Sequence, residues 1–389
     1  MGAALLLVAL DGVLIWGEQP RRSILRPEEA QAGAPAPAPS PVQAPVTSPG
    51  SAPAGFEQAL QQLASDYNGD AGVAVMDLKK GWIASYQGAR PFPQQSVSKL
   101  WVAVGLLDEV DRGRVRLDKV LTIRRQDLSL FSEPIQALVK PVYRASLAEL
   151  LERAIRDSDN AANDLLAGQA GGVQTIEAIM ARKGLHGIAI GADEKHLQGM
   201  IAGVPWRPEF AGNSGFVTAR ARLPAALREA KLDAYVRDPM DGATPVGTVK
   251  GLAALAEGRL LSPSSTQRLL AIMREVRTGK RRLKGGLQRG WTLGHKTGTG
   301  PDLRGASVGI NDVGLMTAPD GHQYAVAVFI ARTRAPVPER LAFMQHVAEL
   351  VEQAWSGRAP PAGPAAKRGG RHSPHQAQAH RERRRHRRR

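Results

Sequence analysis

The chain of 389 residues contains no cysteine. This absence excludes a disulfide framework, a zinc site with thiolate ligands and a lipid attached through cysteine. The sequence also lacks the H-E-x-x-H pattern of a metal-binding helix. Because cysteine usage says nothing about the redox compartment, the N-terminus has to indicate where the protein resides.

Basic residues are missing ahead of the apolar N-terminal stretch. Ala3 to Trp16 is apolar apart from Asp11, and the arginines at 21–22 come only after it. Export signals normally place basic residues before the apolar core, and a transmembrane helix is normally longer. We predict that residues 1–22 are a signal or anchor that takes the protein to the periplasm or outside the cell. A mis-assigned start or an unfolded apolar leader is the alternative.

Two segments of unusual composition flank the central part of the chain. Residues 23–55 contain the Pro/Ala-rich run GAPAPAPSPVQAPVTSPGSAPAG, which predicts an extended linker. Residues 358–389 hold eleven Lys and Arg against one acidic residue and so carry +10 of the net charge of +16. This basic tail is predicted to be disordered. It could contact polyanions nonspecifically through their phosphates, or it could be a solvated tail without a specific role.

Residues 56–357 have the patterns of a folded domain. The 43% apolar content of the chain is typical of a globular protein, and this length can bury a large core. Helices are predicted over 56–67, from the Ser96 segment to Gly113, from Ser146 to the SDNAAN segment, and over 171–184, 247–258, 262–276 and 339–355. Two strands are predicted around a turn at 79–81, and three more over 291–300, 306–318 and 322–332.

The order of these elements predicts the fold class. Strands at both ends of the region, with helices between them, indicate an α+β fold. The expected architecture is an antiparallel sheet built from N- and C-terminal parts, flanked by helices, with an inserted helical subdomain at about 96–245. One helix start has a clear signal, because Ser146 and Glu149 form an S-x-x-E pattern that resembles a capping box.

Ser96 and Lys99 form an S-x-x-K pair at the edge of the apolar run in PFPQQSVSKLWVAV. On a helix the two side chains share one face, so the lysine could help to activate the serine hydroxyl. Ser96 or Ser98 could instead simply cap the helix. This motif alone does not decide between the two interpretations.

Two further motifs stand at the ends of predicted elements. SDN at 158–160 follows the capped helix, and KTG at 296–298 lies on the first C-terminal strand; each occurs once, as does S-x-x-K. In this order the three motifs resemble those of the penicillin-recognising serine enzymes, and most of all the class A β-lactamases. The resemblance spans about 56–355 and includes DGATP at 241–245. It implies the β-lactamase/transpeptidase-like version of the α+β fold.

The resemblance also implies catalytic roles. Ser96 would be acylated, Lys99 would take its proton, and Lys296 across the cleft would destabilise the lysine ammonium. Ser158 would pass a proton to the leaving nitrogen. Glu194 stands at the distance after SDN at which class A enzymes place their deacylating glutamate, so it would activate the hydrolytic water. No cofactor is needed for this chemistry.

Substrate contacts follow from the same resemblance. The backbone N–H groups of Ser96 and Thr299 would bind the oxyanion. Asn160 would hold the amide side chain of the substrate. The strand residues Thr297, Gly298 and Thr299 would bind the substrate together with Lys296, whose charge attracts the substrate carboxylate.

Other candidate contacts are less distinctive. Phe131 would form an apolar rim, or it could be a buried core residue. Arg304, Arg332 and Arg334 could add a second cation, or they could be solvated surface residues.

The sequence departs from the family pattern in one region. Gln198 stands where the family usually has an asparagine that helps to hold the hydrolytic water, and Ala192 replaces the arginine that anchors the Ω loop. An extra segment, 199–240, includes a loop marked by aromatic residues and prolines and a predicted helix. These departures concern turnover and substrate range rather than acylation.

The sequence therefore predicts a class A β-lactamase-like serine hydrolase acting on a small β-lactam or peptidoglycan-like substrate, with no obligate partner. A D-alanyl-D-alanine peptidase or esterase on the same scaffold is the first alternative, and it would not need Glu194. The second alternative is an envelope polyanion-binding protein with a vestigial hydrolase domain. The basic tail favours the second alternative, whereas three intact motifs argue against it.

Overall fold

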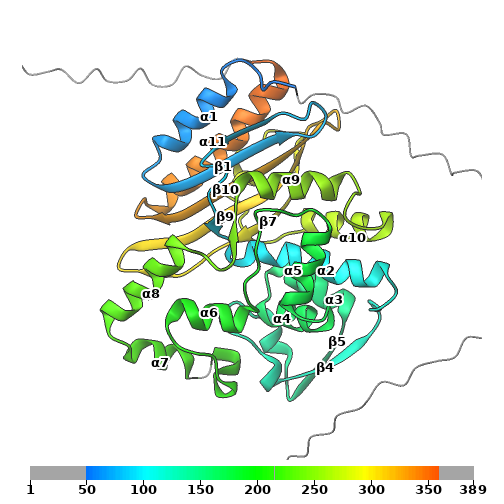
Figure 1. The fold of residues 1–389 in the computed structure, drawn as a ribbon, viewed down its shortest axis with the longest axis vertical. Coiled ribbons are helices and arrows are strands. Elements are labelled where there is room, and N and C mark those ends of the chain that lie inside the picture. The colour runs from blue at the N-terminus through cyan, green and yellow to red at the C-terminus, as the bar shows by residue number, and fades with distance from the viewer. Residues whose placement is uncertain (1–49, 214, 359–389) are drawn as a thin grey trace, which may run out of the picture. The chain divides into compact units, whose positions relative to one another are not determined.

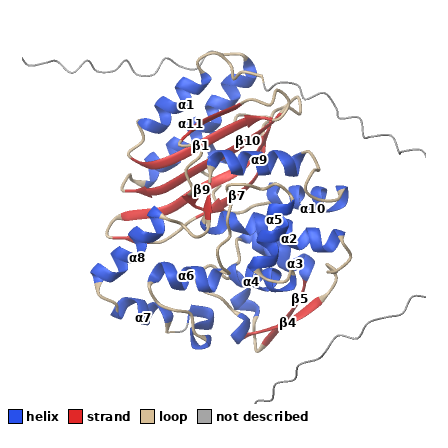
Figure 2. Cartoon of the chain, viewed as in Figure 1, coloured by secondary structure: helices blue, strands red, loops and turns tan. Residues whose placement is uncertain are grey.

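The computed structural model of the protein describes residues 50–213 and 215–358. The predicted leader 1–22, residues 23–49 of the predicted linker and residues 359–389 of the basic tail lie outside these residues. The described part combines an antiparallel sheet with helices on both of its faces and a helical subdomain (Figures 1 and 2). The predicted α+β fold is confirmed. None of the helices in the described ranges is long and apolar enough to cross a membrane.

The sheet joins the N- and C-terminal parts of the domain. Its strands run in the order β2-β1-β10-β9-β7, and β8 pairs with β9. The strands are β1 (Gly69–Asp77), β2 (Ile83–Tyr86), β7 (Thr292–Gly298), β8 (Asp302–Leu303), β9 (Ala306–Thr317) and β10 (Gln323–Thr333). β7, which carries the KTG motif, is the last strand of this path, so one of its sides faces the helical subdomain rather than another strand.

Both faces of the sheet are buried, because successive side chains of a strand point to opposite faces. Val73 and Val75 of β1 belong to a core cluster with residues of α1 (Phe56–Ser65) and α11 (Val337–Ser356). Ala74, between them, belongs to a second cluster with residues of α2 (Ser98–Asp111) and α9 (Pro245–Ala256). The first and last helices predicted from the sequence are confirmed.

The helical subdomain is built around α2, which is buried along almost its whole length. Its other helices are α3 (Leu147–Glu152), α4 (Asn160–Gln169), α5 (Val173–Arg182), α6 (Glu194–Ala202), α7 (Phe216–Arg222), α8 (Ala225–Arg237) and α10 (Pro263–Arg274). Shorter 3-10 or π turns are η1 (Gln95–Val97), η2 (Arg125–Asp127), η3 (Pro134–Leu138), η4 (Arg153–Asp157), η5 (Pro208–Asn213) and η6 (Leu283–Gly286). The extra segment 199–240, in which one helix is predicted, contains both α7 and α8.

The capping box predicted at Ser146 is only half formed. Ser146 Oγ accepts the N–H of Glu149 at 3.2 Å, which caps α3 as predicted. The carboxylate of Glu149 instead accepts hydrogen bonds from Tyr143 and Arg153, so it does not reach back to the cap.

The sequence analysis does not predict four short strands of this region. β4 (Val120–Arg124) pairs with β5 (Val142–Ser146), and β3 (Phe92–Pro93) pairs with β6 (Gly242–Ala243). Val120 and Val142 are exposed, whereas Ile123 and Ala145 are buried in the core, so the β4–β5 pair has one apolar face that the sequence analysis missed. The sequence analysis ends a helix at SDNAAN and does not predict α4, which begins in that segment. Asp159 starts α4 by accepting the N–H of Ala162 at 2.9 Å.

Candidate active site

A strained turn presents Ser96 just before α2. Ser96 lies in η1, and the residue before it, Gln95, has a φ of 51°, in the left-handed region. Two distant groups hold this turn. The N–H of Gln95 donates to Oδ2 of Asp241 at 2.7 Å, and Nδ2 of Asn311 donates to the carbonyl of Gln94 at 2.9 Å. The backbone is therefore held in place immediately before the serine.

Neither Ser96 nor Ser98 caps α2. The N-cap position is Val97, which makes no side-chain capping bond. Ser98 Oγ donates to the carbonyl of Gln95 at 2.9 Å. The helix-capping interpretation of this serine pair is wrong, and the Ser96 hydroxyl is left for another partner.

That partner is Lys99. Its Nζ donates to Ser96 Oγ at 2.9 Å and to Oε1 of Glu194. Lys99 and Glu194 are almost completely buried, so water does not solvate their charges. Each charge is instead compensated by the other. The S-x-x-K spacing brings serine and lysine together as predicted, and the fold adds a carboxylate from a segment far along the chain.

Lys296 of β7 contacts the serine of the SDN motif. Its Nζ donates to Ser158 Oγ at 2.9 Å and to the carbonyl of Thr297 at 3.0 Å. Burial lowers the pKa of Lys296 well below its usual value, and the charge of Lys99 lowers it further. The ammonium form of Lys296 is therefore destabilised in this site.

Asn160, the first residue of α4, presents an unused acceptor. Its Nδ2 donates to the carbonyl of Leu130 at 2.7 Å. Its Oδ1 is buried and has no hydrogen-bond partner within residues 50–213 and 215–358. An unmatched buried acceptor costs about 1–3 kcal/mol. A ligand N–H group would remove this cost.

The end of β7 packs directly against the turn that carries Ser96. A Cβ on Gly298 would lie 2.3 Å from the carbonyl oxygen of Gln94, so only glycine allows this approach. Thr297 is buried, and its Oγ1 shares a hydrogen bond with Oγ1 of Thr278 at 2.6 Å. Its hydroxyl is thus already oriented by a neighbouring loop.

Arg282 is a cation at this site that the sequence analysis missed. Its guanidinium donates to the carbonyls of Gly298 at 2.8 Å and Asn311 at 2.7 Å, and to Oγ1 of the exposed Thr299 at 2.7 Å. Burial lowers the pKa of Arg282. Arg282 belongs to the basic run KRRLK between α10 and β7, so no sequence signal separates it from its solvated neighbours.

The three arginines considered from the sequence lie elsewhere. Arg304 pairs with Glu229 at 2.8 Å, and Arg332 pairs with Asp233 at 2.5 Å. Arg334 donates to the carbonyl of Arg304 at 2.9 Å. These contacts are exposed. The first two connect the loop after β8 and the end of β10 with α8, and all three arginines lie at the surface.

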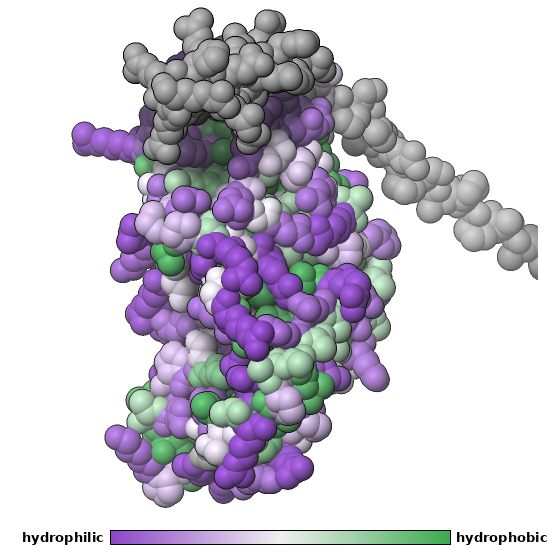
Figure 3. Space-filling view, turned by 90° about the vertical axis from the view of Figure 1, so that its left-hand side faces the viewer, coloured by the Kyte–Doolittle hydropathy of each residue, from purple (hydrophilic) through white to green (hydrophobic). Residues whose placement is uncertain are grey.

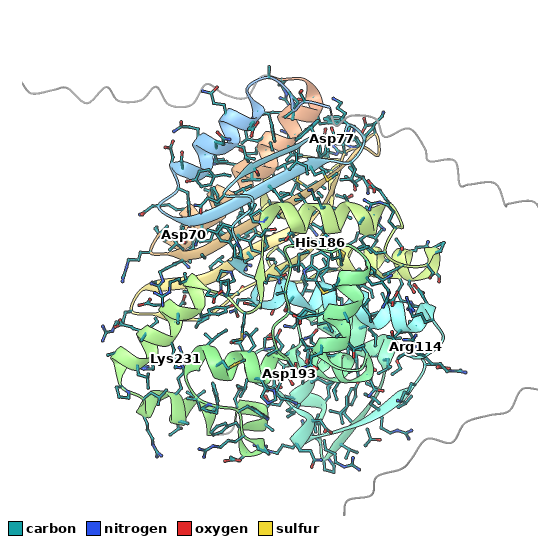
Figure 4. The ribbon with its side chains drawn as sticks, in the orientation of Figure 1. Asp70, Asp77, Arg114, His186, Asp193 and Lys231 are labelled. Atoms are coloured by element: carbon teal, nitrogen blue, oxygen red, sulfur yellow. The ribbon has the colours of Figure 1, made fainter. Side chains whose placement is uncertain are left out.

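Glu194 is held at the first turn of α6. Asp193, labelled in Figure 4, caps the helix by accepting the N–H of His196 at 3.1 Å. Asp164 of α4 accepts the N–H of Glu194 at 2.7 Å. Burial, together with the charges of Asp193 and Glu194, raises the pKa of Asp164 to about 7. Two carboxyl groups therefore position the backbone that carries Glu194.

Gln198 lies one helical turn after Glu194 and contacts its carboxylate. Nε2 of Gln198 is 3.5 Å from Oε2 of Glu194 and donates to Oε1 of Gln95 at 3.2 Å. The amide thus connects the candidate base with the strained residue that precedes Ser96.

Comparison with known proteins gives this arrangement a family. The sequence matches the family model described as "Beta-lactamase enzyme family" over residues 55–355. The chain belongs to the class A β-lactamase family. The motif resemblance seen in the sequence is confirmed, and the protein is a hydrolase of this family.

Relatives and solved β-lactamase structures extend the match over most of the domain. Beta-lactamase VEB-1 of Pseudomonas aeruginosa is 26% identical over 268 residues, which are 69% of this chain and 79% of VEB-1. Extended-spectrum beta-lactamase PER-1 of the same organism is 26% identical over 266 residues, 67% of this chain and 75% of PER-1. A beta-lactamase from Chitinophaga pinensis DSM 2588 superposes with a TM-score of 0.64 at 28% identity, covering 77% of this chain and 99% of that one.

Phe131 lies at the surface of this β-lactamase family member rather than in its core. Its side chain is 38% exposed, and its φ of 64° is in the left-handed region. The ring meets Phe216 edge to face at 5.5 Å. Phe131 also lines a pocket with Gln198, and its role as an apolar rim stays a prediction. Across the described ranges of the chain, no cluster of three or more His, Asp or Glu residues is arranged to hold a metal ion.

The β-lactamase Ω loop is anchored here by a tyrosine. Within the described residues, Asp241 at the end of this loop has no arginine partner, and Ala192 stands at the position of the family's arginine. The hydroxyl of Tyr235 donates to Oδ2 of Asp241 at 3.1 Å and accepts from Nε2 of Gln95 at 2.6 Å. The sequence analysis missed Tyr235 and Gln95, since neither belongs to a family motif.

Proposed function

We propose that the protein hydrolyses β-lactams through an acyl-enzyme on Ser96 and a water molecule activated by Glu194. The observation that carries this proposal is the position of Lys99 Nζ, which donates both to Ser96 Oγ at 2.9 Å and to the Glu194 carboxylate. One buried amino group thus connects the hydroxyl that would be acylated with the carboxylate that would release the product. The substrate is a small β-lactam, and no cofactor takes part.

Acylation requires Lys99 in its neutral form. Transfer of a proton from Lys99 to Glu194 within their contact supplies that form. Ser96 Oγ then attacks the β-lactam carbonyl while its proton moves to Lys99 Nζ. The N–H groups of Ser96 and Thr299 bind the developing oxyanion, which is consistent with the close packing of β7 against the Ser96 turn.

Cleavage of the carbon–nitrogen bond requires a proton on the leaving nitrogen. Ser158 gives its hydroxyl proton to this nitrogen and takes one from Lys296, which donates to Ser158 Oγ at 2.9 Å. The lowered pKa of Lys296 favours this donation. The proton gained by Lys99 balances the one lost by Lys296, so the charge of the site is unchanged.

The substrate is held at both ends. Oδ1 of Asn160, buried and without a partner in the described part of the chain, accepts the N–H of the substrate amide side chain. Lys296, Thr297 and Thr299 bind the substrate carboxylate, and Arg282 supplies the second cation through its contact with Thr299.

Deacylation uses Glu194 as the general base. After acylation Lys99 passes the proton that it took from Ser96 on to the neutral Lys296, and Glu194 then returns its own proton to Lys99. The Glu194 carboxylate now accepts a proton from water as the water attacks the ester on Ser96. Gln198, whose Nε2 lies 3.5 Å from Oε2 of Glu194, orients this water. A D-alanyl-D-alanine peptidase would have no use for this buried carboxylate, which favours the β-lactamase alternative.

Two measurements test the proposal. Hydrolysis of a chromogenic cephalosporin, measured beside release of D-alanine from a peptide ending in D-alanyl-D-alanine, distinguishes the two enzymes; we expect the first and not the second. Mass spectrometry after exposure to benzylpenicillin should detect a transient adduct of one drug per chain. Release of D-alanine together with a persistent adduct would mean that the protein is a D-alanyl-D-alanine peptidase. Location in the periplasm or outside the cell, and polyanion binding by residues 358–389, remain predictions.

A further inference from the structure

Two arginines of the extra segment 199–240 face one small pocket. Arg220 of α7 and Arg228 of α8 line it together with Phe131, Gln198 and Leu303. Figure 3 looks onto the side of the molecule where α7 and α8 lie, and Lys231 marks α8 in Figure 4. The pocket is about 20 Å³ in volume, which is room for one water-sized group.

Neither arginine is neutralised by a residue of the described part of the chain. Within the described ranges, Arg220 and Arg228 form no ion pair, and the Nε of each is buried without a hydrogen-bond partner. Other arginines nearby are paired: Arg207 lies 3.8 Å from Glu209, and Arg304 pairs with Glu229.

The two guanidinium groups are close enough to affect each other. Burial lowers the pKa of Arg220, and the charge of Arg228 lowers it further. Two half-buried cations without a counter-ion are unfavourable, and an anion placed between them removes both the repulsion and the unmatched donors.

The pocket adjoins the part of the site that would receive the acyl side chain of a substrate. Gln198, on its wall, contacts the carboxylate of Glu194. Phe131, also on its wall, follows Leu130, whose carbonyl accepts a hydrogen bond from Asn160. Asn160 is the residue proposed to hold the amide of that side chain, so the pocket lies beyond the amide.

We propose that Arg220 and Arg228 bind a carboxylate on the acyl side chain of the β-lactam, so that the protein prefers substrates with an anionic side chain. This inference rests on the proposed function. A guanidinium group matches the planar geometry of a carboxylate and forms paired hydrogen bonds with it. The pocket has room for one oxygen of a carboxylate and excludes a ring, while Leu232 and Leu303 lower the local dielectric and strengthen the attraction.

Carbenicillin and benzylpenicillin provide a matched pair of probes, because carbenicillin is benzylpenicillin with one additional carboxylate on the side chain. The ratio of their kcat/KM values should fall about tenfold or more in Arg220→Gln and in Arg228→Gln, since each variant removes a charged hydrogen bond. Arg222→Gln is the control: Arg222 is exposed on α7 and does not line the pocket, so its ratio should equal that of the wild type. A general loss of activity in a variant lowers both kcat/KM values equally and therefore leaves their ratio unchanged.

A second measurement needs no variant. In the wild type, added salt should raise the KM for carbenicillin more than the KM for benzylpenicillin, because salt screens the additional charge pair. Equal ratios in all variants, together with equal salt dependence, would overturn the inference while leaving the proposed function in place. A wild type that neither hydrolyses benzylpenicillin nor is acylated by it would overturn the proposed function, and this inference with it.

Discussion

The hydroxyl of Tyr235 donates a hydrogen bond to Oδ2 of Asp241 at 3.1 Å, and the same oxygen accepts the N–H of Gln95 at 2.7 Å. The extra segment is therefore connected, through one carboxyl group, to the backbone immediately before Ser96. Burial raises the pKa of Tyr235 well above its usual value, so its hydroxyl stays protonated and remains a donor.

Replacement of Tyr235 by phenylalanine should loosen this connection. Asp241 would lose a donor and Gln95 an acceptor, so we expect a loss of about 1–2 kcal/mol in the free energy of unfolding. Deacylation should slow more than acylation, because Gln95 also accepts from Gln198 beside Glu194. Denaturant unfolding and single-turnover kinetics measure the two effects. Equal slowing of both steps would contradict a specific link to Glu194.

Replacement of Ser96 by alanine should abolish the covalent adduct with benzylpenicillin without unfolding the protein, because a small side chain becomes smaller. Ser98→Ala is the matched control, since Ser98 donates to the carbonyl of Gln95 and makes no contact with Lys99. Intact-protein mass spectrometry should detect the drug on the control and not on Ser96→Ala. An adduct that persists in Ser96→Ala would mean that another residue is the nucleophile.

Replacement of Glu194 by alanine should separate the two chemical steps. The variant should release one equivalent of product in a burst and then stall with the drug attached, because the ester on Ser96 has lost its general base. Lys195→Ala, at the next position of α6, should turn over like the wild type. Stopped-flow absorbance and mass spectrometry follow the burst and the adduct. If the wild type stalls in the same way, Glu194 has no part in deacylation.

Stability should fall as the pH rises from about 4 to 7. Burial raises the pKa values of Glu133, Asp164 and Asp241 to about 7, above their unfolded values, so the folded state binds more protons in this range. The stabilisation is complete below about pH 4 and lost as the pH passes 7. Asp241→Asn should flatten this dependence in chemical denaturation. Asp118→Asn should leave it unchanged, because hydrogen bonding to Arg116 lowers the pKa of Asp118 out of the range.

Deletion of residues 358–389 should abolish retention on heparin at low salt and leave hydrolysis of a chromogenic cephalosporin unchanged. The reason is that +10 of the net charge lies in this segment. Salt-gradient chromatography of the full chain and the truncated chain makes the comparison. Equal retention of both proteins would place the polyanion-binding surface on the folded domain.

The sequence alone determined the fold class, five of the six strands of the main sheet and the pairing of Ser96 with Lys99. Those features depend on local spacing: apolar periodicity selects helices and strands, and a separation of three residues sets two side chains together on one turn. The three motifs were recognisable for the same reason, since each is contiguous in the chain.

Only the tertiary structure decided which distant groups meet. Glu194 contacts Lys99 because α6 packs on α4 and α4 packs on α2. Tyr235, on α8, meets Gln95 from a segment 140 residues earlier in the chain. Arg282, Arg220 and Arg228 look like any other basic residue in the sequence, since a single sequence does not reveal burial or the absence of a counter-ion. Burial and long-range contacts set the charge balance of the site, because the energy of a charge depends on the neighbours and the water that the whole fold leaves around it.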